Sequence, residues 1–255
     1  MTSTKPGALA GKRALVTGAS SGLGAHFAVL LAAHGAEVVI AARRMDSLAD
    51  VARRVEAHGV ARCLRLDVTD AASRQELAAA AGPIDILVNN AGVVRETPAL
   101  SHSEDDWDAV LDTNLKGMFF LAQALAPGMR ERGGGSIINV ASIAGLSGNS
   151  GAMKTIAYNT SKGAAVNFTR ALAGEWGAYG ITVNALAPGF FPSKMTKGLI
   201  AAVGADKMAA HAPLNRLGDD DDLKGAALLF ASRAGKHITG QILAVDGGVS
   251  AVHGG

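Results

Sequence analysis

The stretch RALVTGASSGLG, residues Arg13–Gly24, passes from a short apolar run into a glycine-rich turn, and an alanine-rich segment follows it to His34-Gly35. This order predicts a strand, a tight turn and a helix. Glycines in such a turn let the backbone approach a pyrophosphate, and the N-terminus of the next helix offers unpaired N–H groups to an anion. The GxxxGxG spacing differs from the best-known dinucleotide fingerprint, so a turn without a ligand is the alternative for this motif alone.

Short apolar runs alternate with helical segments along the whole chain, without an internal repeat or a change in composition. That alternation predicts an α/β fold, a single-domain, Rossmann-like, doubly wound parallel sheet with helices on both faces, formed by residues 1–255. Residues 190–216 have no clear period and contain Pro192 and Pro213, so a substrate loop or lid is expected there. The predicted strands are Arg13–Thr17, Glu37–Ala42, Cys63–Leu66, Ile84–Val88, Ser136–Val140, Ile181–Ala185 and Gln241–Val245.

The composition is typical of a globular enzyme with a large core, because 49% of the 255 residues are hydrophobic and 18% are charged. The net charge is only +2 and no cluster of lysine or arginine occurs, which argues against nucleic acid as a partner. The N-terminus lacks an apolar core of signal-peptide length, and no run is long enough to span a membrane, so a cytoplasmic protein without a membrane partner is expected. The single cysteine, Cys63, excludes an intramolecular disulfide, and the seven histidines lack metal-ligand spacing, so no metal is expected.

Tyr158 and Lys162 stand four residues apart in the segment YNTSK, which is typical of a helix. At that spacing the two side chains share a face. A cation beside a phenol favours the phenolate, which lowers the pKa of the tyrosine from its usual value of about 10. The pair is therefore predicted to exchange protons at working pH, and a chance pairing on a helix surface is the alternative.

The end of the predicted strand Glu37–Ala42 bears on the choice of cofactor. A dinucleotide fold that takes NAD offers an acidic residue to the adenosine ribose there, whereas this chain has Ala42 followed by Arg43 and Arg44. A guanidinium binds a 2′-phosphate through charge-assisted hydrogen bonds, so NADP(H) is favoured. NAD(H) stays possible because an arginine can stack on adenine, and both arginines are alternatively solvated residues of a helix over Met45–Gly59.

Three polar features leave their roles open at this point. Asp67, at a predicted strand end, is suited either to the adenine amino group or to the N-cap of the next helix. The run Asp219–Asp222 is expected to open a helix, where it would cap the N-terminus and oppose the helix dipole. Asn114 lies among apolar residues of a predicted helix around Trp107–Leu125, where asparagine weakens the helix, so a purpose other than helix stability is expected.

Several motifs taken together resemble those of one enzyme family, the short-chain dehydrogenase/reductases. The resemblance covers most of the chain, from Leu9 to Val249. Segments 213–218 and 239–248 further resemble the branch that contains 3-oxoacyl carrier-protein reductases and gluconate or glucose dehydrogenases. The motifs occur in the order Gly18, Gly22, Gly24, Asn89-Asn90-Ala91-Gly92, Asn114, Ser142, Tyr158, Lys162 and Pro188-Gly189.

The resemblance implies an oxidoreductase that interconverts a ketone and a secondary alcohol by hydride transfer with a nicotinamide cofactor. Tyr158 would be the proton donor or acceptor, and Lys162 would lower the pKa of that tyrosine and hold the nicotinamide ribose. Ser142 would bind the substrate oxygen, and Asn114 would hold a water that links Lys162 to solvent.

The resemblance also implies where the cofactor binds and that the chain forms a homotetramer or homodimer, built partly from the helices that carry Asn114 and Tyr158. Cofactor contacts are expected at Gly18, Ser20, Ser21, Gly22, Leu23, Gly24, Arg43, Arg44, Asp67, Val68, Asn90, Ala91, Gly92, Tyr158, Lys162, Pro188, Gly189, Phe191 and Ser193.

One departure from the family concerns the substrate, a small ketone or alcohol. The segment between Ser142 and Tyr158 is longer than is common in the family, and the extra residues fall in 148–155. Some sugar-acid dehydrogenases of the family have a similar extension, so a gluconate-type dehydrogenase is the alternative to a 3-oxoacyl or carbonyl reductase. Candidate contacts to an acidic substrate are Lys154, Lys194 and Lys197, which are alternatively solvated residues at a loop rim.

An alternative of another class is a nucleotide-binding sensor or scaffold that keeps the fold without turnover. The complete set of four catalytic groups counts against that reading, because a sensor has no need of them.

Overall fold

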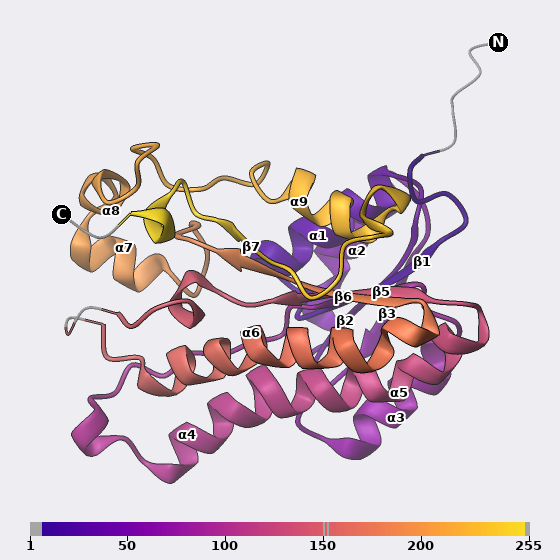
Figure 1. The fold of residues 1–255 in the computed structure, drawn as a ribbon, viewed down its shortest axis with the longest axis horizontal. Coiled ribbons are helices and arrows are strands. Elements are labelled where there is room, and N and C mark those ends of the chain that lie inside the picture. The colour runs from indigo at the N-terminus through magenta and orange to yellow at the C-terminus, as the bar shows by residue number, and fades with distance from the viewer. Residues whose placement is uncertain (1–6, 150, 152, 253–255) are drawn as a thin grey trace.

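The computed structural model describes residues 7–149, 151 and 153–252. These residues form a parallel sheet of seven strands between two layers of helices (Figure 1). The strand order is β3-β2-β1-β4-β5-β6-β7, as expected for a doubly wound fold. The strands are β1 Arg13–Thr17, β2 Glu37–Ala42, β3 Ala61–Arg65, β4 Ile86–Asn89, β5 Gly135–Val140, β6 Ile181–Pro188 and β7 Ile242–Val245.

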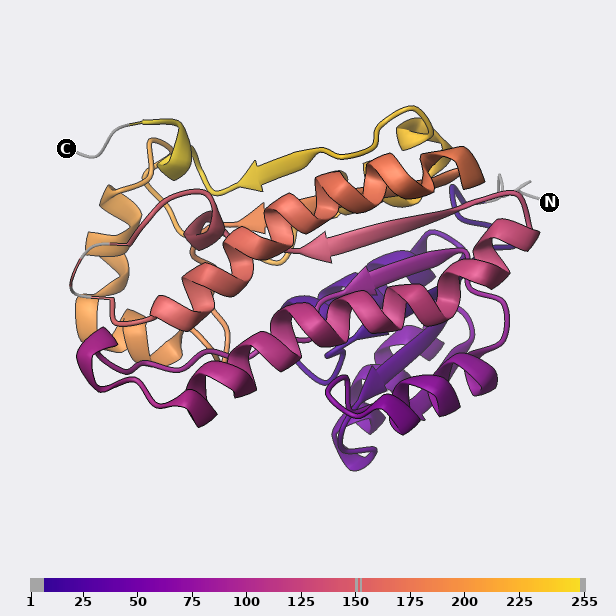
Figure 2. The same ribbon diagram turned by 60° about the horizontal axis from the view of Figure 1, so that its bottom comes forward.

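Side chains that alternate along the strands build a core on each face of the sheet. On one face, Ala14 and Val16 of β1 pack against α1 Gly22–Ala33, α2 Ala49–Glu56 and α9 Lys224–Ala231. On the other face, Leu15 of the same strand belongs to the core beneath the remaining long helices, which Figure 2 brings to the front. Those helices are α3 Ala71–Ala81, α5 Gly117–Glu131 and α6 Ile156–Trp176.

The predicted helix around Trp107–Leu125 is interrupted by a π-helical turn. α4 Glu104–Leu111 leads into the π turn Asp112–Lys116, and α5 follows without a break. Asn114 lies inside that turn and is fully buried. Single π turns occur frequently at functional sites, where they change the direction of a side chain or free a carbonyl group.

Residues 190–216 contain two short helices, α7 Lys197–Val203 and α8 Ala205–Ala210, where the sequence predicts a loop. Elements of seven and six residues are too short to produce a detectable period. Gly204, with a φ of 95°, makes the bend between them. The region after β6 is thus a flap with two short helices in its middle and non-helical segments on either side of them.

The expectation that Asp219–Asp222 caps a helix is wrong. α9 begins at Lys224, and no side chain caps its N-terminus. The acidic run instead forms a turn, in which Asp222 accepts hydrogen bonds from the Asp219 backbone N–H at 2.9 Å and from both terminal nitrogens of Arg216 at 2.6 Å. The Arg216 guanidinium holds the pKa of Asp222 down, at about 2.

The sequence predicts no segment that spans a membrane, and the helices of the structure were compared with that prediction. Within residues 7–149, 151 and 153–252, none of the helices combines the length and the apolar character needed to cross a bilayer.

Candidate active site

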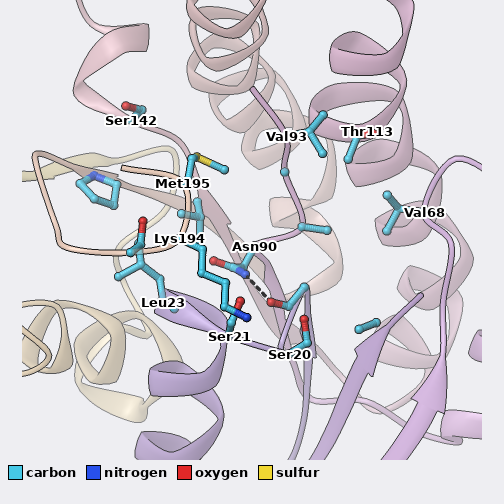
Figure 3. Close-up of a pocket in the computed structure, with 18 of the residues that line it drawn as sticks. Ser20, Ser21, Leu23, Val68, Asn90, Val93, Thr113, Ser142, Lys194 and Met195 are labelled. Atoms are coloured by element: carbon cyan, nitrogen blue, oxygen red, sulfur yellow. Dashed lines mark hydrogen bonds between the residues drawn. The ribbon is translucent and has the colours of Figure 1, made fainter. Parts of the chain in front are cut away.

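A cavity of about 750 Å³ opens at the carboxyl ends of the strands, beside the point between β1 and β4 where the strand order reverses (Figure 3). Ligands of doubly wound sheets bind at such a switch point, and the volume is ordinary for a small-molecule site. Every predicted cofactor contact except Gly24 lines this cavity. Of the four predicted catalytic residues, Ser142, Tyr158 and Lys162 line it, and Asn114 does not.

The glycine-rich turn packs closely against the residues that follow β4. Gly18 has a φ of 62°, and a Cβ atom there would lie 2.9 Å from the Cα of Ala91. Gly24 faces the protein, since a Cβ atom there would come within 2.5 Å of the Asn90 side chain and of the Gly18 carbonyl oxygen. Gly24 therefore allows α1 to pack against the turn, and it is not among the residues that line the cavity.

The N-terminus of α1 is open to an anion. Its N-cap residue, Ser21, makes no capping hydrogen bond with its side chain, and the first turn carries no acidic residue. The first N–H groups of a helix need acceptors, and the helix dipole favours a negative charge at that end. The turn and the helix together fit the pyrophosphate of a dinucleotide, which is the group that the sequence predicts here.

Arg43 and Arg44 follow β2, three strands away from β5 and Ser142 in the sheet order, on the side where the sequence predicts the adenosine end. Ser47 also lines this part, and its hydroxyl donates to the Arg44 carbonyl at 2.6 Å. The strand end that would carry an acidic residue in an NAD site carries Ala42.

Asp67 lines the same part of the cavity, and it is not an N-cap. Asp70 caps α3 by accepting the Ala72 backbone N–H at 3.0 Å. The Asp67 carboxylate accepts hydrogen bonds from the backbone N–H and the hydroxyl of Thr69, at 3.0 and 2.7 Å. Partial burial raises the pKa of Asp67, but these two hydrogen bonds and the nearby arginines outweigh it and leave the pKa lowered. A carboxylate of fixed orientation is therefore available at the adenine end.

Tyr158 and Lys162 lie on one face of α6, beside Ser142 at the end of β5. The Lys162 ammonium is buried and donates to the Val140 carbonyl oxygen at 2.6 Å. It lies 5.6 Å from the centroid of the Tyr158 ring. The Ser142 hydroxyl accepts the Ala144 backbone N–H at 3.1 Å, which fixes its position at the cavity wall.

The pKa of Tyr158 differs from the sequence prediction. Burial raises this pKa, and the hydrogen bond between the phenol and the Ser142 hydroxyl opposes the rise without cancelling it. Burial also lowers the pKa of Lys162, to about 8. The prediction that the ammonium lowers the pKa of Tyr158 is thus wrong, because burial of the phenol has the larger effect on this pKa. The ammonium lies over the tyrosine ring and donates its hydrogen bond to the Val140 carbonyl oxygen.

Asn114 stands behind the cavity wall and ties two segments together. Its side-chain oxygen accepts the Val93 N–H at 2.8 Å, and its amide nitrogen donates to the Val93 carbonyl and to the Ser161 hydroxyl. A Cβ atom on Gly92 would lie 3.3 Å from the Asn114 side-chain oxygen and 3.7 Å from the Lys162 ammonium. Gly92, which lines the cavity, therefore lies next to both the Asn114 side chain and the Lys162 ammonium.

Of the three lysines considered for an acidic substrate, Lys194 lines the cavity, and Lys154 and Lys197 are not among its lining residues. The longer segment 148–155 includes residues 150 and 152, which lie outside the described residues. Next to them, Asn149 donates to the side chains of Thr155 and Asn159, at 3.2 and 3.0 Å. Asn149 is therefore held at the start of α6, close to Tyr158 in the chain.

Sequence reasoning missed several lining residues. Most are neighbours of predicted contacts whose side chains reach the cavity only through packing, so no local motif marks them. For Thr196 a signal existed, since its position three residues after Ser193, just before α7, is typical of a helix start. The missed lining residues are Ala42, Ser47, Leu66, Val93, Thr113, Val140, Ala141, Met195 and Thr196.

Comparison with known proteins agrees with this geometry. A family model described as enoyl-(acyl carrier protein) reductase matches residues 18–250. The gluconate 5-dehydrogenase of Gluconobacter oxydans is 41% identical over 248 residues, which cover 95% of this chain and 96% of that protein. A 3-oxoacyl-[acyl-carrier-protein] reductase of Staphylococcus aureus is 38% identical over 244 residues, covering 93% and 98%.

Solved structures share the fold over nearly the whole chain. The gluconate 5-dehydrogenase of Burkholderia cenocepacia, in complex with NADP and tartrate, superposes with a TM-score of 0.90 at 38% identity, covering 96% of this chain and 97% of that chain. A short-chain type dehydrogenase/reductase of Mycobacterium marinum superposes with a TM-score of 0.89 at 36% identity, covering 94% and 96%. The chain therefore belongs to the short-chain dehydrogenase/reductase family, whose members are NAD(P)-dependent oxidoreductases of alcohol and carbonyl groups.

Proposed function

We propose that this chain interconverts a ketone and a secondary alcohol with NADP(H), and that Tyr158 transfers the proton. The observation that carries the proposal is one cavity with Ser142, Tyr158 and Lys162 at the end of β5 and with Arg43 and its neighbour after β2. Proton-transfer groups at one end and cations at the other are the arrangement that a dinucleotide lying across the switch point needs.

Each group has a distinct task in the proposed reaction. The nicotinamide, when bound, supplies or accepts the hydride. Tyr158, whose pKa is raised, keeps its proton at neutral pH and donates it to the carbonyl oxygen during reduction. Ser142 donates a hydrogen bond to the same oxygen and stabilises the negative charge that develops there. Lys162 holds a positive charge beneath the tyrosine and contacts the nicotinamide ribose.

Asn114 serves the proton path through its place in the π turn. Both N–H groups of the Asn114 side-chain amide already donate to protein acceptors, and the side-chain oxygen already accepts the Val93 N–H. A water between Lys162 and solvent would therefore be held by the backbone carbonyl of this turn, where the regular helical hydrogen bonding is interrupted.

NADP(H) is proposed as the preferred cofactor because Arg43 and Arg44 line the adenosine end and no acidic residue ends β2. The relatives crystallised with NADP support the same choice. Arg43→Ala is expected to lower kcat/KM for NADP by about 30-fold and to change the value for NAD by much less, since a charge-assisted contact to the 2′-phosphate is lost.

Initial rates with both cofactors measure this effect, with Arg170→Ala as the control. Arg170 is an exposed arginine of α6 and does not line the cavity. A wild-type preference for NAD, or an equal loss with both cofactors, would contradict the assignment of Arg43.

A polyhydroxy acid of the gluconate type is the substrate class proposed for the first test, with residues 190–216 as the loop that covers it. Support comes from the gluconate dehydrogenases among the relatives and from Asn149 of the longer segment, which is held at the start of α6. A 3-oxoacyl thioester is the second candidate, favoured by the relative from Staphylococcus aureus. Turnover of gluconate and other sugar acids, compared with acyl thioester ketones and simple cyclic ketones, separates the two.

A homotetramer or homodimer in the cytoplasm is the proposed state of the protein. Trp107 and Phe120, on α4 and α5, expose 37% and 39% of their surfaces, which leaves apolar area on these helices for contacts between subunits. Sedimentation equilibrium gives the number of subunits, and a monomer at micromolar concentration would contradict the proposal. Cell fractionation tests the location.

A further inference from the structure

A lysine on the flap after β6 lies across the cavity from the glycine-rich turn. Lys194 lines the cavity together with Ser20 and Ser21 of that turn. In Figure 3 its extended side chain runs from the flap toward Ser20 and Ser21 and away from Ser142. The ammonium is therefore directed at the N-terminus of α1, and not at the proton-transfer end of the cavity.

The backbone that carries Lys194 is held by a compact turn. The Thr196 hydroxyl donates to the Phe191 carbonyl oxygen at 2.6 Å, and the Ser193 hydroxyl accepts the Thr196 N–H at 3.2 Å. Phe191 is buried in the core, so the turn has a fixed base. A Cβ atom on Gly22 would lie 3.8 Å from the Cβ of Ser193, which puts this turn in van der Waals reach of the glycine-rich turn.

The other cationic side chains that line the cavity belong to its two ends. Arg43 and Arg44 lie at the adenosine end, and Lys162 is buried beside Tyr158. Among the described residues, Lys194 takes part in none of the ion pairs. The segment between the two ends has backbone N–H groups and the helix dipole for an anion, and the Lys194 ammonium is the full positive charge that the flap brings to it.

We propose that Lys194 binds the pyrophosphate of NADP(H) and so links the flap to the N-terminus of α1. This inference rests on the proposed function, since it needs the dinucleotide to lie along the cavity. It assigns the lysine to the cofactor and not to the carboxylate of an acidic substrate. Because the contact lies on the flap, cofactor binding would also fasten the wall of the substrate site.

The test measures cofactor affinity without turnover. Quenching of protein fluorescence by NADPH gives Kd for the wild type and for Lys194→Met, which keeps the length of the side chain and removes its charge. Kd is expected to rise about fivefold, as for an exposed charge contact, and Lys194→Arg should restore most of the affinity. Lys197→Met is the matched control, because it removes a charge from the same flap outside the cavity.

A second ligand separates the pyrophosphate from the 2′-phosphate. Adenosine 2′-monophosphate lacks a pyrophosphate, so its Kd should be unchanged by Lys194→Met and raised by Arg43→Ala. An unchanged Kd for NADPH in Lys194→Met would overturn the inference, and so would a loss seen only in KM for gluconate, which would assign the lysine to the substrate. Failure of the wild type to bind NADPH at all would instead contradict the proposed function.

Discussion

The Lys162 ammonium is enclosed in protein, and its pKa of about 8 makes the proton-transfer site sensitive to mildly alkaline pH. Because this pKa is lowered, the lysine is charged below pH 8 and loses its charge above it. The raised pKa of Tyr158 keeps the phenol protonated through this range, as reduction requires, so loss of the Lys162 charge is the change expected to slow reduction. The rate of ketone reduction is therefore expected to be level at neutral pH and to fall above about pH 8, while alcohol oxidation rises with pH.

Lys162→Arg distinguishes the lysine from other groups that titrate in this range, because a guanidinium stays charged at all pH values used. In the variant, the fall in the reduction rate should move to higher pH, even though the rate itself is lower. Circular dichroism verifies that the larger side chain leaves the fold intact. A fall at the same pH in both proteins would show that another group controls it.

Individual residues of the site were largely predictable from the sequence because their chemistry is local. The glycines around the start of α1, the arginines after β2 and the pair on α6 each follow from spacing along a few residues. The raised pKa of Tyr158 was not predictable, since it depends on how completely the neighbouring segments enclose the phenol. The role of Asp67 likewise depended on Asp70, which takes the N-cap position three residues later.

At the scale of elements, the contact between the turn after β5 and α6 sets the distance from Ser142 to Tyr158. A Cβ atom on Gly145 would lie 2.4 Å from the Lys162 backbone carbon and 2.5 Å from its oxygen. Gly145→Ala is therefore expected to push the turn away from α6 and to lower the free energy of unfolding by about 2 kcal/mol. Loss of alignment between the two elements should reduce kcat more than cofactor affinity.

Gly174→Ala is the matched control for that variant. Gly174 lies on the same helix, and a Cβ atom there would meet nothing within 4 Å. Replacement of an unconstrained helical glycine is expected to raise the free energy of unfolding by about 0.5 to 1 kcal/mol. Urea unfolding measures both variants, and equal stability of the two would contradict the close contact at Gly145.

Element bounds followed the sequence well where a strand was long and apolar, as in β1 and β2, whose bounds agree with prediction. They failed where tertiary contacts decide the structure. The helices α7 and α8 of the flap are too short for periodicity, and the π turn around Asn114 arises where α4 and α5 join against α6. The acidic run before α9 was misassigned because its ion pair with Arg216 lies within a turn.

At the scale of the whole molecule, the fold brings separate segments to one cavity. The turns after β1, β2 and β3 line the part of the cavity proposed for the adenosine and the phosphates, and β5 and α6 carry the residues proposed for proton transfer. The alternation of strands and helices was enough to predict this arrangement, since parallel strands place their carboxyl ends along one edge of the sheet. Because the two ends are built from different segments, chemistry and cofactor binding should be separable by substitution.

Tyr158→Phe is the most direct test of the central claim, that the phenol of Tyr158 transfers the proton. The variant keeps the ring over which the Lys162 ammonium lies and removes only the hydroxyl. Turnover of NADPH with an acyl thioester ketone or a cyclic ketone that the wild type reduces, and Kd for NADPH, are measured on the same preparation. The account predicts a loss of kcat of about a thousandfold or more with an unchanged Kd. Turnover near that of the wild type, with NADPH bound normally, would contradict it.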